Sequence, residues 1–159
     1  FRLGRDLKIP QSEAQRIIAD YFGAFPRVRA FLDGTLDAAR TTGFVTTLTG
    51  RRRAADGIHA TKHQERAAAE RMALNMPIQG LAADIIKIAM VRLRARLLDA
   101  GLDARIVLQV HDELVLEAAE GQGDAVAALL RDTMQGAYPL AVPLAVEVGR
   151  GRVWSELHG

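Results

Sequence analysis

The stretch Leu108-Gln-Val-His-Asp-Glu-Leu-Val-Leu116 decides how the rest of this chain is interpreted. It places His111, Asp112 and Glu113 between two runs of apolar residues with high β-propensity. Apolar runs interrupted by a short polar segment predict an antiparallel hairpin with the polar residues at its tip. Adjacent like charges on a tight turn repel each other, and a bound cation would relieve that repulsion. A solvated turn is the alternative, because Asp is common in turns.

The composition is that of a globular protein with one core or two small lobes. The chain has 159 residues, of which 49% are hydrophobic and 25% charged. It contains no cysteine, which excludes disulfides, thiolate zinc sites and cysteine nucleophiles. No run of eighteen apolar residues occurs, so we expect no membrane-spanning segment and no membrane partner. The start, Phe1-Arg-Leu-Gly, has neither an initiator methionine nor a signal peptide, and we expect the chain to be cut from a longer one.

The charge is unevenly distributed along the chain. Residues 1–71 carry thirteen Lys and Arg against eight Asp and Glu, a balance of +5. Residues 72–159 carry eight against eleven, a balance of −3, which leaves the net charge of +2. A basic front half beside an acidic back half suits a protein that holds a polyanion near a bound metal, although many ordinary domains share this feature.

Helical periodicity dominates the first part of the chain and a long central segment. Apolar spacing predicts one helix that opens at Pro10 and a second that runs from Pro26 to Gly43, with their aromatic residues in the core. A third helix is expected from about Gln64 to Ala100, and Pro77 should kink or break it. Its predicted buried stripe consists of Ala82, Ile85, Ile86, Ala89, Met90, Leu93 and Leu97.

The remaining segments predict β structure and one further helix. A small hairpin is expected from Phe44–Leu48 and its basic return strand, followed by a loop over residues 54–63. After the central hairpin we expect a helix over 124–136, a strand over 143–148 and an irregular tail. Helices followed by an antiparallel β layer with helical cover predict the α+β class.

Two polar sets are candidates for nucleic-acid contact. Arg51-Arg-Arg53 can contact phosphates, or can simply form a solvated face. Arg71, Asn75 and Gln79 lie at i, i+4 and i+8, so a helix would align them on one side. Donors in such a row can reach minor-groove acceptors, which occur at every base pair, and so test duplex shape without reading sequence. An exposed polar helix face is the alternative.

Several of these motifs together resemble one protein family. The segment from Glu70 to Met90, with Asn75-Met-Pro-Ile-Gln79 at its centre, looks like the helix that leads into the palm of family A DNA polymerases. Gln109-Val-His-Asp-Glu-Leu-Val115 looks like motif C of that family. Thr47-Leu-Thr-Gly-Arg-Arg52 resembles its small fingers hairpin, and Val146–Trp154 its closing strand. The matches occur in the same order over nearly the whole chain.

The resemblance implies a role for each matching residue. Asp112 matches the motif C carboxylate that helps to hold a catalytic Mg²⁺ pair, and Glu113 matches a supporting carboxylate. His111 matches the residue beside the primer terminus. Three further residues match positions that contact primer–template DNA: Arg71, Asn75 and Gln79. In the small hairpin, the expected phosphate contacts are Arg51 and Arg52. Phe1 matches an aromatic residue near the template, although Arg2 stands where the family commonly has Gly.

The sequence also departs from the family pattern. Motif A, with its own metal-binding aspartate, and the fingers helix that grips the incoming nucleotide are not among these 159 residues. The stretch Arg53-Ala-Ala-Asp-Gly-Ile58 differs from the usual one after the hairpin arginines. We therefore expect a two-metal Mg²⁺ site that an upstream aspartate completes, and no chain extension by these residues alone.

The resemblance implies late fingers over residues 1–66 and the last part of the palm over 67–159. The parent would be a DNA-directed DNA polymerase that adds deoxynucleotides to a primer 3′-OH, with primer–template DNA and deoxynucleoside triphosphates as partners. We expect it to be a monomer in the cytoplasm of a bacterial or phage-infected cell. A non-catalytic DNA-binding remnant of a polymerase is the alternative.

Overall fold

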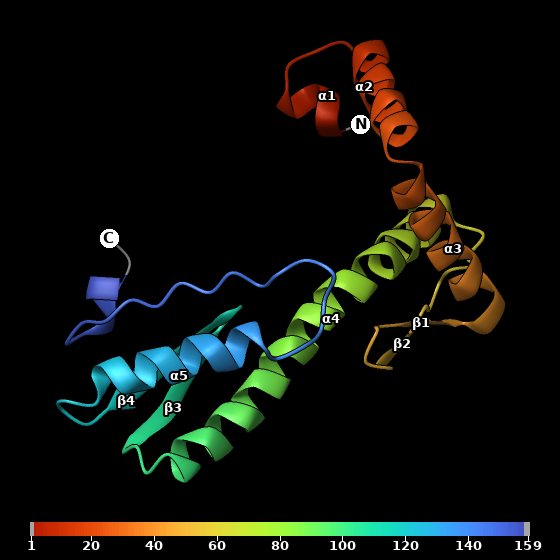
Figure 1. The fold of residues 1–159 in the computed structure, drawn as a ribbon. Coiled ribbons are helices and arrows are strands. Elements are labelled where there is room, and N and C mark those ends of the chain that lie inside the picture. Colours follow the sequence, from red (N-terminus) through yellow and green to blue (C-terminus); the bar gives the residue numbers. More distant parts are fainter. Residues whose placement is uncertain (1, 158–159) are drawn as a thin grey trace. The chain divides into compact units, whose positions relative to one another are not determined.

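A computed structural model describes residues 2–157 of the chain (Figure 1). Phe1, whose resemblance to a template-side aromatic is noted above, lies outside the described residues. The chain divides into two compact units, Phe1–Pro77 and Ile78–Gly159. This division falls inside a long helix, whereas the sequence suggested a domain boundary after residue 66. The assignment of the two parts to fingers and palm stays a prediction.

The first unit begins with three helices: α1 (Arg2–Asp6), α2 (Gln11–Ala24) and α3 (Pro26–Thr42). Pro26 stands in the first turn of α3, where its missing N–H costs nothing because that group has no intrahelical partner. Gly43 ends α3 in the left-handed conformation with φ +75°, and its N–H donates to the Ala39 carbonyl at 2.9 Å. Both limits of this helix agree with the sequence prediction.

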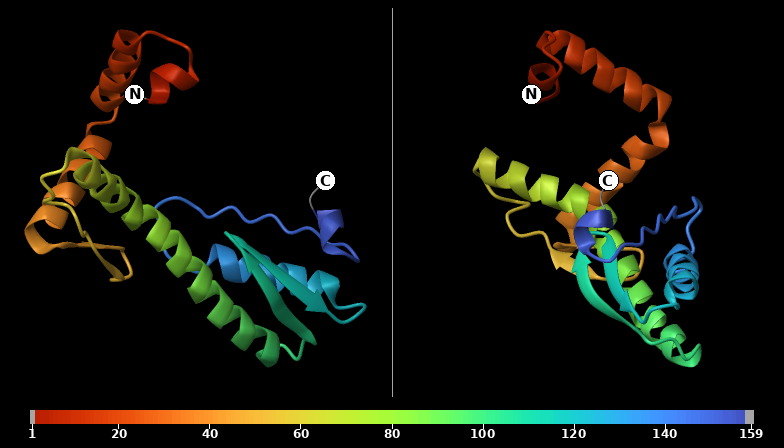
Figure 2. Two further views of the ribbon diagram at one scale, coloured as in Figure 1. Left: turned by 180° about the vertical axis from the view of Figure 1, so that it is seen from behind. Right: turned by 90° about the vertical axis from the view of Figure 1, so that its left-hand side faces the viewer.

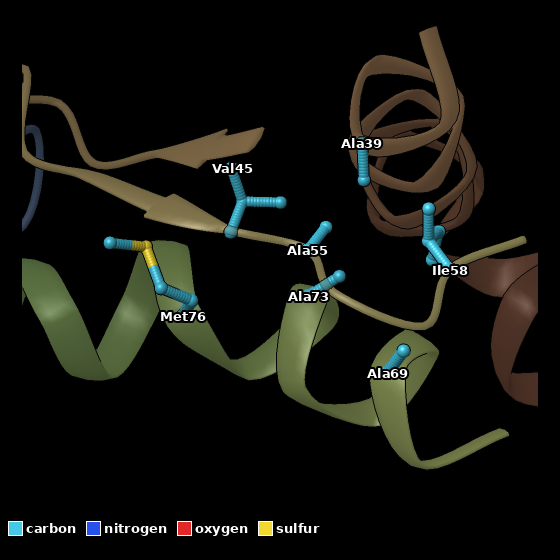
Figure 3. Packing of buried hydrophobic residues seen from close by; sticks show 7 residues of the cluster. All are labelled: Ala39, Val45, Ala55, Ile58, Ala69, Ala73 and Met76. Atoms are coloured by element: carbon cyan, nitrogen blue, oxygen red, sulfur yellow. The ribbon is translucent and has the colours of Figure 1, made fainter. Parts of the chain in front are cut away.

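A short hairpin and the start of the next helix complete the core of the first unit. β1 (Phe44–Thr46) pairs antiparallel with β2 (Arg52–Ala54). The core gathers small residues around a few larger ones from α3, the hairpin, the following loop and α4 (His63–Asp99) (Figure 3). These buried residues are Ala39, Val45, Ala55, Ile58, Ala69, Ala73 and Met76.

The expectation that the aromatic residues of the first two predicted helices lie in the core is wrong for Tyr21, Phe25 and Phe31. Tyr21, Phe25 and Phe31 are 49%, 53% and 48% exposed, and Ala14 is the residue that α2 buries. Tyr21 instead packs against its neighbours Phe22 and Phe25, with ring centroids 5.4 and 5.0 Å apart. The helical period was correctly assigned, but in residues 2–157 these aromatic side chains are about half exposed.

The long helix α4 runs through Pro77 without a break. The predicted break therefore does not occur, although Pro77 removes one backbone donor from the helix. Ala73 and Met76 are buried before the proline, and Ile86 is buried after it. Of the predicted stripe, Ile86, Ala89, Leu93 and Leu97 are buried, whereas Ala82 is exposed.

By length and composition alone, α4 could also cross a membrane. An 18-residue window within it has a mean hydropathy of 1.3, and 22% of that window is buried. Core helices of soluble proteins meet the same test, so a single such helix is weak evidence for a membrane span. The absence of a membrane segment thus stays a prediction.

The second unit is built on a hairpin, with a helix packed against it (Figure 2). β3 (Ala104–Val110) pairs antiparallel with β4 (Glu113–Ala118), and α5 (Gly123–Gln135) follows. The core consists of Leu93 and Leu97 of α4 with Val126 and Leu130 of α5, against which hairpin residues such as Ile106 and Leu116 pack. Because three elements share one core, the hairpin has a fixed support.

Two arginines of α4 fasten the end of α5. Arg92 Nη1 donates to the carbonyls of Gly136 and Ala137, at 3.1 and 2.9 Å. Arg96 Nη1 donates to Asp132 Oδ2 at 2.6 Å and to Thr133 Oγ1 at 2.9 Å. Carbonyls at a helix C-terminus lack intrahelical partners, and a cation there also opposes the negative end of the helix dipole.

The strand predicted over residues 143–148 does not form. Each of the two sheets described in residues 2–157 has two strands, and neither includes this segment. Its burial still alternates, with Leu144, Val146 and Val148 half-buried and the residues between them exposed. The pattern of a strand is present without a hydrogen-bonded neighbour. A short 3₁₀ helix, Trp154–Leu157, follows, and the α+β class is confirmed.

Candidate active site

The hairpin of the second unit brings the three predicted site residues to one tip. Val110 pairs with Glu113, so His111 and Asp112 form a two-residue turn and Glu113 begins β4. All three side chains are exposed to solvent. The sequence interpretation of this segment as a hairpin with a polar tip is therefore correct.

The turn has an unusual backbone conformation and a side-chain support. His111 has φ +52°, in the left-handed region that non-glycine residues seldom adopt. Gln109 Nε2 donates to the His111 carbonyl at 3.0 Å. This bond joins residues two apart in the chain, and it was not predicted from the sequence.

A β-bulge sets the register of the two strands. Ile106 pairs with Leu116, but the next pair is Leu108 with Val115, so Val107 is an extra residue in β3. An added residue shifts the following side chains to the opposite faces of the strand. It places Gln109 opposite Leu114 and shortens the turn to two residues.

The tip carboxylates line the large groove of the second unit. The groove has a volume of about 1810 Å³, and Asp112 and Glu113 are among its lining residues. Apolar residues of α4 such as Ile85 and Ala89 also line it, together with β4, α5 and residues 144–154. The groove therefore combines apolar side chains with carboxylate oxygen donors, an arrangement suited to a substrate bound near a cation.

The donor chemistry of the tip fits Mg²⁺. This ion prefers carboxylate oxygen and commonly takes one or two protein carboxylates, with waters and substrate phosphates filling the other positions. Asp112 and Glu113 supply such oxygens on adjacent residues. In the part of the chain that the structure describes, no cluster of three or more His, Asp or Glu could hold a metal. The tip is thus suited to part of a metal site.

The three polar residues of the predicted row all lie on α4 and are exposed. Arg71 and Asn75 belong to the first unit and Gln79 to the second, because the units divide at Pro77. The buried Ala73 and Met76 lie between them in sequence, on the side that packs into the first core. Each of the three side chains is therefore accessible to a ligand.

The arginines of the small hairpin are exposed in the first unit. Arg51 precedes β2 and its N–H donates to Thr47 Oγ1 at 3.2 Å. The Arg52 guanidinium lies over the Phe44 ring, 4.8 Å from its centroid. This cation–π contact orients Arg52 while leaving its N–H groups available to a phosphate.

Comparisons with known proteins identify the family. The model of DNA polymerase family A matches residues 1–156. The chain belongs to DNA polymerase family A. Similar family A proteins include the thermostable DNA polymerase I of Thermus aquaticus, with 54% identity over 96% of this chain and 18% of the relative. DNA polymerase I of Deinococcus radiodurans is 50% identical over 96% of this chain and 16% of the relative.

A solved structure of a polymerase domain matches the fold of this family A chain. It is the POL domain of Pol1 from M. smegmatis, in complex with DNA primer-template and dNTP. The TM-score is 0.92 at 48% identity, over 98% of this chain and 27% of that chain. The family A chain spans less than a fifth of the length of the curated relatives named above. The resemblance recognised in the sequence is confirmed.

Proposed function

We propose that this chain is the C-terminal part of a DNA-directed DNA polymerase, with late fingers over residues 1–66 and part of the palm over 67–159. The parent would add deoxynucleotides to a primer 3′-OH under direction of a template. One observation carries the proposal. In a chain that matches family A over residues 1–156, the motif C carboxylates stand at a hairpin tip and line a large groove.

In this proposal Asp112 is a ligand of catalytic Mg²⁺ and Glu113 supports it from the adjacent position. When bound, two such ions activate the primer 3′-OH and stabilise the leaving pyrophosphate. The hairpin holds the Asp112 carboxylate on a support that is packed against α4 and α5. An upstream aspartate of motif A would complete the ligand set. His111, beside Asp112 in the turn, would lie against the primer terminus.

The DNA contacts follow from exposed donors. Arg71, Asn75 and Gln79 would reach minor-groove acceptors of the primer–template duplex, which are present at every base pair. Arg51 and Arg52 would contact backbone phosphates, and these contacts position a duplex without reading its sequence. Supporting this, the solved relative with TM-score 0.92 is described as a complex with DNA primer-template and dNTP.

Further properties of the parent belong to the same proposal. It acts as a monomer in the cytoplasm of a bacterial or phage-infected cell, where template DNA and nucleoside triphosphates are present. Its 159-residue part does not extend a primer by itself, because it supplies two carboxylates of a site that needs more. Extension by the isolated part that disappears with Asp112→Ala would contradict this expectation.

Primer extension by the full-length parent tests the function. Asp112→Asn should abolish nucleotide addition and leave the dissociation constant for duplex DNA within about twofold. Asp103→Asn is the matched control, since Asp103 is an exposed carboxylate at the opposite end of the same hairpin. Full extension by Asp112→Asn would contradict the metal role. A parent that binds DNA but extends no primer would favour the non-catalytic remnant.

A further inference from the structure

The turn at the tip of the hairpin contains a residue in an unfavourable backbone conformation. His111 adopts φ +52°, and for an L-residue other than glycine this conformation costs roughly 1–2 kcal/mol. The turn that contains it is exposed, so surrounding packing contributes little to holding it. The Gln109 side-chain amide supplies a restraint, because its Nε2 donates to the carbonyl of His111 at 3.0 Å.

The bulge at Val107 sets the register in which this bond occurs. Without the extra residue, continued pairing from Ile106 with Leu116 would set Gln109 opposite Glu113 and leave a three-residue loop. The observed register sets Gln109 opposite Leu114, one pair before the end of the ladder. From there its side chain reaches over the turn to the peptide that joins His111 to Asp112.

We propose that Gln109 is a positioning residue: it fixes the peptide between His111 and Asp112 and so aims the Asp112 carboxylate into the groove. This inference rests on the proposed function of Asp112 as a metal ligand. Displacement of a reacting group by about 1 Å can cost on the order of a hundredfold in rate, so a bond that holds the preceding carbonyl matters for catalysis. Gln109 is itself exposed, and direct contact with DNA is the competing role.

The experiment uses the full-length parent with Gln109→Met, which keeps the length of the side chain and removes its donor. Gln122→Met is the matched control, because Gln122 Oε1 accepts a bond from the Asp103 N–H at 2.7 Å, at the other end of the same hairpin. Three quantities are measured: the Mg²⁺ concentration for half-maximal extension, amide exchange of residues 110–114 without metal, and duplex affinity without metal.

Gln109→Met should raise the half-maximal Mg²⁺ concentration roughly two- to fivefold and accelerate exchange at the tip by a similar factor, as loss of one hydrogen bond predicts. Its duplex affinity should stay within about twofold of the wild type. Gln122→Met should leave the Mg²⁺ requirement unchanged and should accelerate exchange only at its own end of the hairpin.

Unchanged exchange at the tip would overturn the positioning role, whatever happens to activity. Weakened duplex affinity with an unchanged Mg²⁺ requirement would also overturn it and would assign Gln109 to DNA contact. Because exchange is measured without metal or DNA, it reports on the turn even in a weakly active or partly destabilised variant. Failure of the proposed function is recognised separately, by retained extension in Asp112→Asn.

Discussion

Removal of the Leu93 side chain tests whether α4, α5 and the hairpin depend on one core. Leu93 is fully buried, at 0% exposure, in contact with the cluster that includes Leu97, Val126 and Leu130. Leu93→Ala deletes three carbon groups at about 0.8 kcal/mol each and leaves a cavity as well. The unfolding free energy of the second unit should therefore fall by about 3 kcal/mol.

Native-state hydrogen exchange on the full-length parent can measure this loss unit by unit. Amides of β3, β4 and α5 should exchange roughly a hundredfold faster in Leu93→Ala, since every 1.4 kcal/mol corresponds to a factor of ten. Leu98→Ala is the matched control, because Leu98 lies on the same helix at 70% exposure, and it should change stability by less than about 0.5 kcal/mol. Equal exchange in the two variants would refute the shared core.

Three other predictions concern local features. Gly43→Ala should destabilise the first unit by about 1 kcal/mol in thermal unfolding, because Gly43 has φ +75°. An added Cβ would meet no atom within 4 Å, so this cost comes from the backbone conformation and not from a clash. Gly34→Ala inside α3 should be neutral or stabilising in the same assay. Glu117→Gln should change the unfolding free energy by less than about 0.5 kcal/mol, because the ion pair of Glu117 with Arg105 is exposed. A larger change in denaturant titration would show that this ion pair contributes to stability and would contradict the prediction. Gln79→Ala should weaken duplex binding and extension together, by roughly fivefold on all sequences. Gln135→Ala on α5 should change neither quantity. An effect of Gln79→Ala that is confined to one sequence context would argue against shape recognition.

Local signals in the sequence were sufficient for most elements. Pro26 and Gly43 marked the ends of α3 because each has a specific backbone preference at a helix end. The apolar runs around residues 111–113 marked β3 and β4 in the same way. For the candidate site, this information already placed Asp112 and Glu113 at the tip of a hairpin. Helix ends and hairpin strands depend on residues that are neighbours in the chain, so a local sequence pattern can predict them.

Features that depend on distant partners could not be predicted in this way. The alternation of Leu144, Val146 and Val148 indicates a strand, but a strand also needs a hydrogen-bonded neighbour, which a linear pattern does not report. The apolar spacing of Tyr21 and Phe25 likewise indicates an apolar face without saying what covers it. The bulge at Val107 depends on the pairing of β3 with β4, which no local pattern in the chain reports.

The most direct test of the central claim is the position of a metal at the hairpin tip. The full-length parent would be crystallised with primer–template DNA, a non-hydrolysable deoxynucleotide analogue and Mn²⁺, which anomalous scattering can locate. We predict a peak at about 2.0–2.2 Å from a carboxylate oxygen of Asp112, the bond length of a small octahedral cation. Mn²⁺ bound only to other residues, with Asp112 free of metal, would contradict the account.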